Sequence, residues 1–148
     1  MEMFAAIAVV LATLTTGMTA GLFGAFSYAV MPGLGRAEDR AFVDVMRHIN
    51  RAILNGWFLS CYLGAFVFTV VAAVLNIGDP ALVWILPALP LYLGTFVITA
   101  VVNVPLNNQL EREGDRAAFE SRWVLWNIVR TVTTVLAFLS LIAALLET

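Results

Sequence analysis

The residues that could do chemistry in this chain gather in segment 123–130, WVLWNIVR, which carries an arginine into an otherwise apolar helix. Helical spacing of i, i+3, i+4 and i+7 predicts one shared face for Trp123, Trp126, Asn127 and Arg130. Arg130 lies about 10 Å along the helix from Trp123. A charge at that depth costs about 2.5–3.5 kcal/mol on insertion scales. We therefore expect Arg130 to face the bundle interior and to have a partner there.

A second polar set precedes this segment and forms one stripe of a helix. Its members recur at intervals of three or four residues and are Tyr92, Thr95, Thr99, Asn103 and Asn107. Pro105 cannot donate a hydrogen bond to the carbonyl of Val101, so a backbone acceptor is freed beside Asn103. The polar residues that crowd at one end of the predicted bundle are His48, Asn50, Asn55, Asn103, Asn107, Asn108, Asn127 and Arg130. They can converge there.

The partner of Arg130 is left open by the sequence. No Asp or Glu occurs deep in an apolar run, and Asp44, Glu111 or Glu120 could reach the guanidinium only from the rim. Amide oxygens, freed carbonyls or a bound anion remain. Arg130 is then either a structural arginine that fixes helix register or a group that binds an anion of delocalised charge. A guanidinium among amide donors in a dry pocket stabilises an oxyanion strongly.

His48 and the tryptophans each have two interpretations. Histidine titrates near neutral pH, so His48 could be a general base, although a lone histidine beside Arg47 and Arg51 is more often a surface residue. Trp57, Trp123 and Trp126 could form an aromatic belt at the membrane interface. On the Arg130 face, Trp126 is the better candidate for stacking on a flat aromatic ligand.

No metal or bound cofactor is expected. One His, one Cys and scattered methionines provide no ligand spacing for zinc, copper or non-haem iron. Phosphate-binding loops, dinucleotide fingerprints and Ser/His/Asp sets are absent as well. The single cysteine, Cys61, excludes an internal disulfide and is expected to be a buried apolar residue.

The composition is that of a membrane protein. The 148 residues are 61% hydrophobic and 12% charged, whereas charged residues make up about 25% of an ordinary soluble domain. Four apolar runs each reach the roughly 20 residues that span a bilayer, and they are 3–31, 52–77, 81–105 and 123–146. The first run has no basic segment before it and is too long for a signal-peptide core, so we expect it to be retained. The bilayer is the expected environment, and no nucleic-acid partner is predicted.

These patterns predict an all-α fold, a single membrane domain over 1–148 that forms a four-helix transmembrane bundle with up-down-up-down topology. The expected helices are about 3–31, 37–77, 80–108 and 116–146. Met31-Pro32-Gly33 should end the first helix. Within 37–77, an amphipathic surface helix should lead into a span that begins near residue 52. Asp79 should cap the third helix and Asp115 the fourth.

Arginine placement predicts the orientation. Four of the eight arginines lie between the first and second runs and three between the third and fourth, while the 76–80 connection and both ends carry none. The positive-inside rule then puts loops 32–51 and 108–122 in the cytoplasm, as a cytoplasmic surface helix requires, and both termini outside. A bacterial cytoplasmic membrane is the expected location.

Small residues four apart mark one side of the first run, in the two series Thr13, Gly17, Gly21 and Thr16, Ala20, Gly24. Such spacing lets a neighbouring helix approach closely. This face could pack against another helix of the same chain or against a second copy of the chain in a homo-oligomer.

The chain resembles the anthrone oxygenase-like family of small integral membrane proteins. The resemblance covers nearly the whole chain. It depends on Pro32, the Ile49-Asn50 pair, the segment Asn103-Val-Pro-Leu-Asn107, and the motif Trp123-x-x-Trp126-Asn127-x-x-Arg130. It implies oxidation of an anthrone-like polycyclic phenol to a quinone by dioxygen, without an added cofactor.

If the resemblance holds for the activity, the residues that stabilise the charge on the substrate are Arg130, Asn103, Asn107 and Asn127. The base that removes the substrate proton is His48 or water. Substrate contacts are expected from Trp126, Trp123, Asn50, Tyr92 and Thr99. The alternative is a non-enzymatic membrane protein that binds a lipid, a quinone or a partner subunit in the same pocket. A transporter is disfavoured because the chain has no internal repeat.

Overall fold

A computed structural model describes residues 2–147, and within that range the chain is helical with no β-strand. Four helical stretches are long and apolar enough to cross a membrane, namely Glu2–Leu34, Gly56–Leu75, Leu82–Glu113 and Arg116–Leu145. The chain is therefore an all-helical integral membrane protein.

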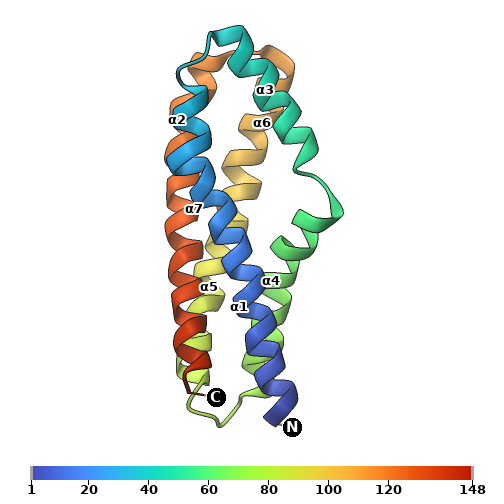
Figure 1. The fold of residues 1–148 in the computed structure, drawn as a ribbon, viewed down its shortest axis with the longest axis vertical. Coiled ribbons are helices and arrows are strands. Elements are labelled where there is room, and N and C mark those ends of the chain that lie inside the picture. The colour runs from blue at the N-terminus through green and yellow to red at the C-terminus, as the bar shows by residue number, and fades with distance from the viewer. Residues whose placement is uncertain (1, 148) are drawn as a thin grey trace.

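The long helices lie side by side as a bundle (Figure 1). Helix α1 (Glu2–Ala25) packs against α4 (Gly56–Leu75) and α7 (Arg116–Leu145), and α7 also packs against α5 (Leu82–Ile98). Both ends of the chain and the 76–81 connection lie at the bottom of the view, and α3 (Asp39–Ala52) lies at the top. The α3 end of the bundle is where the candidate site forms.

Two apolar cores fill the bundle. One lies among α1, α4, α5 and α7 and includes Val9, Ile85 and Leu141. The other joins α3 to the upper parts of the long helices, and it contains Phe42, Val43, Met46, Leu106, Leu110, Phe119 and Trp123. Because α3 buries Phe42, Val43 and Met46 while its charged residues are exposed or half-buried, it closes one end of the bundle.

Two of the long helical stretches contain a π-helical turn that ends two residues before a proline. Segment η1 (Phe26–Val30) follows α1 and leads into α2 (Met31–Leu34), which has Pro32 in its first turn. Segment η2 (Thr99–Asn103) follows α5 and leads into α6 (Val104–Glu113), which has Pro105 in its first turn. Proline lacks an N–H and its ring crowds the preceding turn, so the wider turn accommodates it without ending the helix. The helix therefore continues through Met31-Pro32-Gly33 and ends at Leu34, one residue beyond the expected stop, with Gly35 as its C-cap.

The other helix boundaries differ from expectation at three places. The expected helix 37–77 is interrupted at residues 53–55, where Asn55 caps α4 by accepting from the Phe58 amide at 2.9 Å. The third stretch begins at Leu82 and runs to Glu113, since Asp79 accepts from the Ala81 amide in the turn before α5. Asp115 caps α7 through the Ala118 amide, as expected.

Candidate functional site

Arg130 is buried in the middle of the bundle, with 7% of its surface exposed. Its Nε donates to Asn127 Oδ1 at 3.0 Å and its Nη1 donates to Thr99 Oγ1 at 3.3 Å. The guanidinium carbon lies 4.1 Å from the Phe23 ring centroid and 5.3 Å from that of Trp123. These contacts orient the group between aromatic faces, where cation–π attraction offsets part of its desolvation.

No carboxylate pairs with Arg130 among residues 2–147. The ion pairs of the described chain join Arg51 to Glu111 and Arg116 to Asp39 and Glu120, all at the α3 end. A guanidinium carries five N–H donors, and only two of its nitrogens are engaged by the hydrogen bonds above. Arg130 therefore retains both a full positive charge and the donor capacity to bind an anion.

Asn127 holds the Arg130 side chain in place through hydrogen bonds to α7 and to the end of the first long helix. Its Nδ2 donates to the Phe23 carbonyl at 3.1 Å and to Ser27 Oγ at 2.8 Å, and its Oδ1 accepts from Arg130. The side chain is fully buried. Since its donors are committed to α1, its oxygen is fixed toward the guanidinium, and Asn127 both orients Arg130 and ties α7 to α1.

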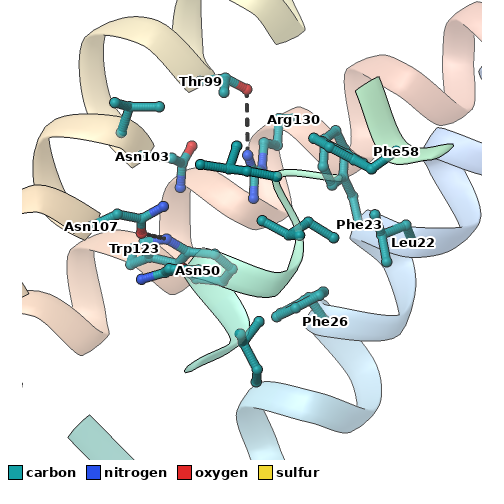
Figure 2. Close-up of a pocket in the computed structure, with 14 residues that line it drawn as sticks. Leu22, Phe23, Phe26, Asn50, Phe58, Thr99, Asn103, Asn107, Trp123 and Arg130 are labelled. Carbon is teal, nitrogen blue, oxygen red and sulfur yellow. Dashed lines mark hydrogen bonds between the residues drawn. The ribbon is translucent and has the colours of Figure 1, made fainter. Parts of the chain in front are cut away.

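A cavity of about 90 Å³ opens in front of the guanidinium, where the two apolar cores meet (Figure 2). One side of it is polar, with Asn50, Thr99, Asn103, Asn107 and Arg130. The other side is aromatic and aliphatic, with Leu22, Phe23, Phe26 and Phe58, while the Trp123 ring lies beside Asn107 and Asn50. Ile53 and Leu54, from the interruption between α3 and α4, also line it. The cavity therefore suits a molecule with a flat apolar body and one polar edge.

Asn103 is the least satisfied polar group at this cavity. It is 1% exposed, and neither its Nδ2 nor its Oδ1 has a hydrogen-bond partner. A buried amide left unpaired costs about 1–3 kcal/mol for each unmade hydrogen bond. It lies at the end of η2, and π-helical turns occur often at functional sites. Asn103 thus offers a donor and an acceptor to a guest beside Arg130.

The comparison with known families bears on this same region. A family model described as anthrone oxygenase matches residues 57–140, more than half of the chain. The chain belongs to the anthrone oxygenase family. The matched range contains Thr99, Asn103, Asn107, Trp123 and Arg130, so it includes most of the polar side of the cavity. No curated protein and no solved structure matches the chain.

In this anthrone oxygenase family member, six of the predicted site residues line one cavity: Asn50, Thr99, Asn103, Asn107, Trp123 and Arg130. Asn107 is held there because its Oδ1 accepts from Trp123 Nε1 at 2.8 Å. Asn127 lies behind Arg130 and touches it without lining the cavity.

Trp126 does not share the Arg130 face. It is 36% exposed and borders a separate surface hollow with Val101, Pro105 and Arg122, so the expectation that it walls the Arg130 pocket was wrong. On a helix of 3.6 residues per turn, Trp126 lies about 60° to one side of Trp123 and Asn127 about 40° to the other. Burial of Asn127 therefore turns Trp126 outward and leaves Trp123 as the aromatic wall.

Tyr92 and His48 do not line the cavity either. The Tyr92 hydroxyl is deep in the core, where it donates to the Tyr62 carbonyl at 2.9 Å. His48 is exposed on α3, and its Nδ1 lies 2.6 Å from the Asp44 carbonyl. No metal-binding cluster of three His, Cys, Asp or Glu side chains occurs within residues 2–147.

Three residues of this region were missed from the sequence: Phe23, Phe58 and Tyr62. Phe23 and Phe58 line the cavity, and Tyr62 stacks on Phe58 with ring centroids 5.3 Å apart. Nothing in the sequence marks the two phenylalanines as site residues, because aromatic residues in an apolar run are ordinary core residues. Tyr62 could have been noticed, since it is the only tyrosine in the second apolar run.

Proposed function

We propose that this protein is a membrane-embedded oxygenase that oxidises an anthrone-like polycyclic phenol with dioxygen to a quinone, without a metal or organic cofactor. The observation that carries the proposal is the pairing of Arg130, a buried cation with no carboxylate partner among residues 2–147, with Asn103, a buried amide with no partner at all. Membership of the anthrone oxygenase family supports it.

The chemistry needs an anion held away from bulk water. An anthrone is a weak carbon acid, and loss of one methylene proton, here to water, gives an extended oxyanion that reacts directly with dioxygen. Arg130 and Asn103 stabilise the charge on the guest oxygen and then on the peroxide. Asn107 adds a polar contact, and Trp123 supplies the flat wall.

The closed cavity is too small for this guest. An apolar cavity of about 150 Å³ holds a single benzene ring, whereas this one has about 90 Å³. Ile53 and Leu54 border it from the non-helical interruption before α4, and Leu54 is 68% exposed. Outward movement of this short connection would admit a three-ring guest without unpacking the long helices.

Oxygen uptake by purified protein with anthrone tests the proposal. Replacing Arg130 with Met should reduce uptake at least about 100-fold, since electrostatic groups of this kind contribute 10²–10³ to turnover. The matched control is Arg122→Met, because Arg122 is exposed on the same helix. Equal oxygen uptake by the Arg130→Met variant and the wild type would remove Arg130 from the mechanism.

A non-catalytic binding role is the second candidate. The observation that favours it is that no carboxylate or imidazole occurs among the residues that line the cavity, so no ordinary base faces a guest. Isolation of the protein with a bound lipid or quinone, together with no oxygen uptake on anthrone, would support this role and exclude the first.

The same proposal includes an orientation. Seven arginines lie near the α3 end, and by the positive-inside rule they support a cytoplasmic position for that end and for the mouth of the cavity, with both termini on the outer side of a bacterial membrane. Accessibility of single cysteines engineered at exposed Arg36 and exposed Ile77, in a Cys61→Ala background, would test it in intact cells. Labelling of the residue-77 cysteine alone by an impermeant maleimide is the expected result.

A further inference from the structure

The Tyr62 hydroxyl is a second buried polar group without a partner near Arg130. Tyr62 is 7% exposed, and its Oη has no hydrogen-bond partner. The Tyr62 ring packs against Phe58 and Phe96, and the centroids of the Tyr62 and Phe96 rings are 4.5 Å apart. Because rings fix it on several sides, the hydroxyl cannot turn to solvent. A buried phenol that stays unpaired requires an explanation.

The position of this hydroxyl connects it to the cavity. Tyr62 lies edge-on to Phe23, with centroids 6.3 Å apart, and Phe23 carries the Arg130 guanidinium on its face. Phe96 packs on the Tyr62 ring, and Thr99 follows Phe96 by three residues in the same helical stretch, which brings the hydroxyl near Thr99 and the Arg130 guanidinium. Tyr92 shares the same core, yet its hydroxyl donates to the Tyr62 carbonyl. Of the two core tyrosines, Tyr62 is the one whose proton is not engaged.

Thr99 lies between Tyr62 and the guest. Its Oγ1 donates to the Thr95 carbonyl at 2.8 Å and accepts from Arg130 Nη1 at 3.3 Å. A hydroxyl has one donor and two acceptor positions, so one acceptor position remains. Thr99 also lines the cavity. It can therefore take a proton from Tyr62 on one side and, when its hydroxyl turns from the Thr95 carbonyl, deliver its own proton to a guest on the other.

We propose that Tyr62 is the proton source of the site and acts through Thr99. The inference assumes the proposed oxygenase function. When the guest carbanion forms a C–O bond with dioxygen, its electron pair passes to oxygen and a peroxide anion results. The Thr99 hydroxyl proton moves to that anion as the Tyr62 proton replaces it. Tyr62 is left as a phenolate, which the Arg130 charge stabilises.

The same residue then completes the reaction. The phenolate takes a proton back from the Thr99 hydroxyl as the Thr99 oxygen removes the remaining hydrogen, as a proton, from the carbon that bears the hydroperoxide. The C=O bond forms, the O–O bond breaks, and hydroxide leaves. Hydroxide takes up the proton that the guest released at the start and becomes water. One guest and one dioxygen thus give one quinone and one water, and Tyr62 returns to its starting state.

Buried Tyr62 and exposed Tyr28 make a matched pair for the test. Anthrone binding is measured without oxygen, and uptake is measured with oxygen in H₂O and in D₂O. Tyr62→Phe should bind anthrone within twofold of wild type and turn it over about 100-fold more slowly, in the range of a lost general acid. It should also lose the solvent isotope effect. Tyr28→Phe, at an exposed position, should match wild type.

A second pair of variants approaches the relay from its other end. Thr99→Val should reproduce the Tyr62→Phe pattern, and Thr99→Ser, which keeps the hydroxyl, should restore the isotope effect. Wild-type turnover and isotope effect in Tyr62→Phe would overturn the inference alone. Loss of anthrone binding in Tyr62→Phe would overturn it as well, in favour of a structural role. A wild-type protein that consumes no oxygen with anthrone would instead overturn the proposed function, and this inference with it.

Discussion

Arg130 and Asn127 lie one turn apart on α7, and the guanidinium Nε donates to the amide oxygen at 3.0 Å. The amide nitrogen of Asn127 is held in turn by the Phe23 carbonyl and by Ser27. A neutral acceptor thus orients the buried cation and leaves its charge unneutralised. A carboxylate at the same place would orient it equally well but would cancel the charge that an anionic guest needs.

Asn127→Asp tests this relationship. The new carboxylate would pair with Arg130, and the donor Nδ2, which bonds the Phe23 carbonyl and Ser27, would be replaced by an oxygen that only accepts. We expect the affinity for anthrone to fall at least about tenfold, or about 1.4 kcal/mol, with helical content retained. Binding titrations in detergent, with Asn108→Asp as the exposed control, measure the change. Unaltered affinity in Asn127→Asp would show that the guest does not use the Arg130 charge.

Arg130→Met should separate stability from function. An arginine buried without a carboxylate partner has a desolvation cost that its amide, hydroxyl and aromatic contacts offset only partly. We expect the melting temperature to be equal to or higher than that of wild type, while anthrone binding is lost. Thermal unfolding followed by circular dichroism, beside Arg122→Met, tests this. A fall of the melting temperature by ten degrees would mean that Arg130 is primarily structural.

Trp123 and Trp126 should respond differently to a guest. Trp123 lines the cavity and donates to Asn107 Oδ1, whereas Trp126 lies on the outer surface. Anthrone should quench tryptophan fluorescence in the Trp126→Phe variant and much less in the Trp123→Phe variant. Trp123→Phe should also cost about 1–2 kcal/mol of stability, because it leaves the Asn107 oxygen unpaired. Equal quenching in both variants would place the guest elsewhere.

Arg116 should matter for stability alone. It joins the start of α7 to the end of α2, since its guanidinium donates to the Gly35 and Ala37 carbonyls and pairs with Asp39 and Glu120. Arg116→Met should lower the free energy of unfolding, because the hydrogen bonds and ion pairs of its guanidinium are lost. Exposed Arg36 provides the control, Arg36→Met. Anthrone affinity should be unchanged in both variants, because neither residue lines the cavity.

The cover of the cavity gives a further prediction. Leu54 borders the cavity from the interruption between α3 and α4. Leu54→Gly would remove an apolar side chain from this cover and loosen the connection. Association of anthrone should accelerate several-fold in stopped-flow fluorescence. Leu59→Gly, at a lipid-facing position beyond the cavity, is the control. An association rate unaffected by Leu54→Gly would place the opening elsewhere.

The sequence determined the general architecture because that depends on local properties. Four runs of about twenty apolar residues require helices, since a bilayer does not satisfy exposed backbone groups. The polar stripe at Thr99, Asn103 and Asn107 and the charge of Arg130 were visible as helical spacing, and they do meet at one cavity. Orientation and homo-oligomer formation stay predictions.

Tertiary structure decided which side chains face that cavity. Spacing alone could not distinguish Trp123 from Trp126, because both lie within about 60° of the same helix face, and the packing of α7 on α1 set the rotation. The prolines at positions 32 and 105 indicated helix ends or disturbances, yet the neighbouring helices kept both stretches continuous through π-helical turns. The unpaired atoms of Asn103 and Tyr62 are also tertiary facts. A missing hydrogen-bond partner depends on every residue around the group, and no local stretch of sequence contains that information.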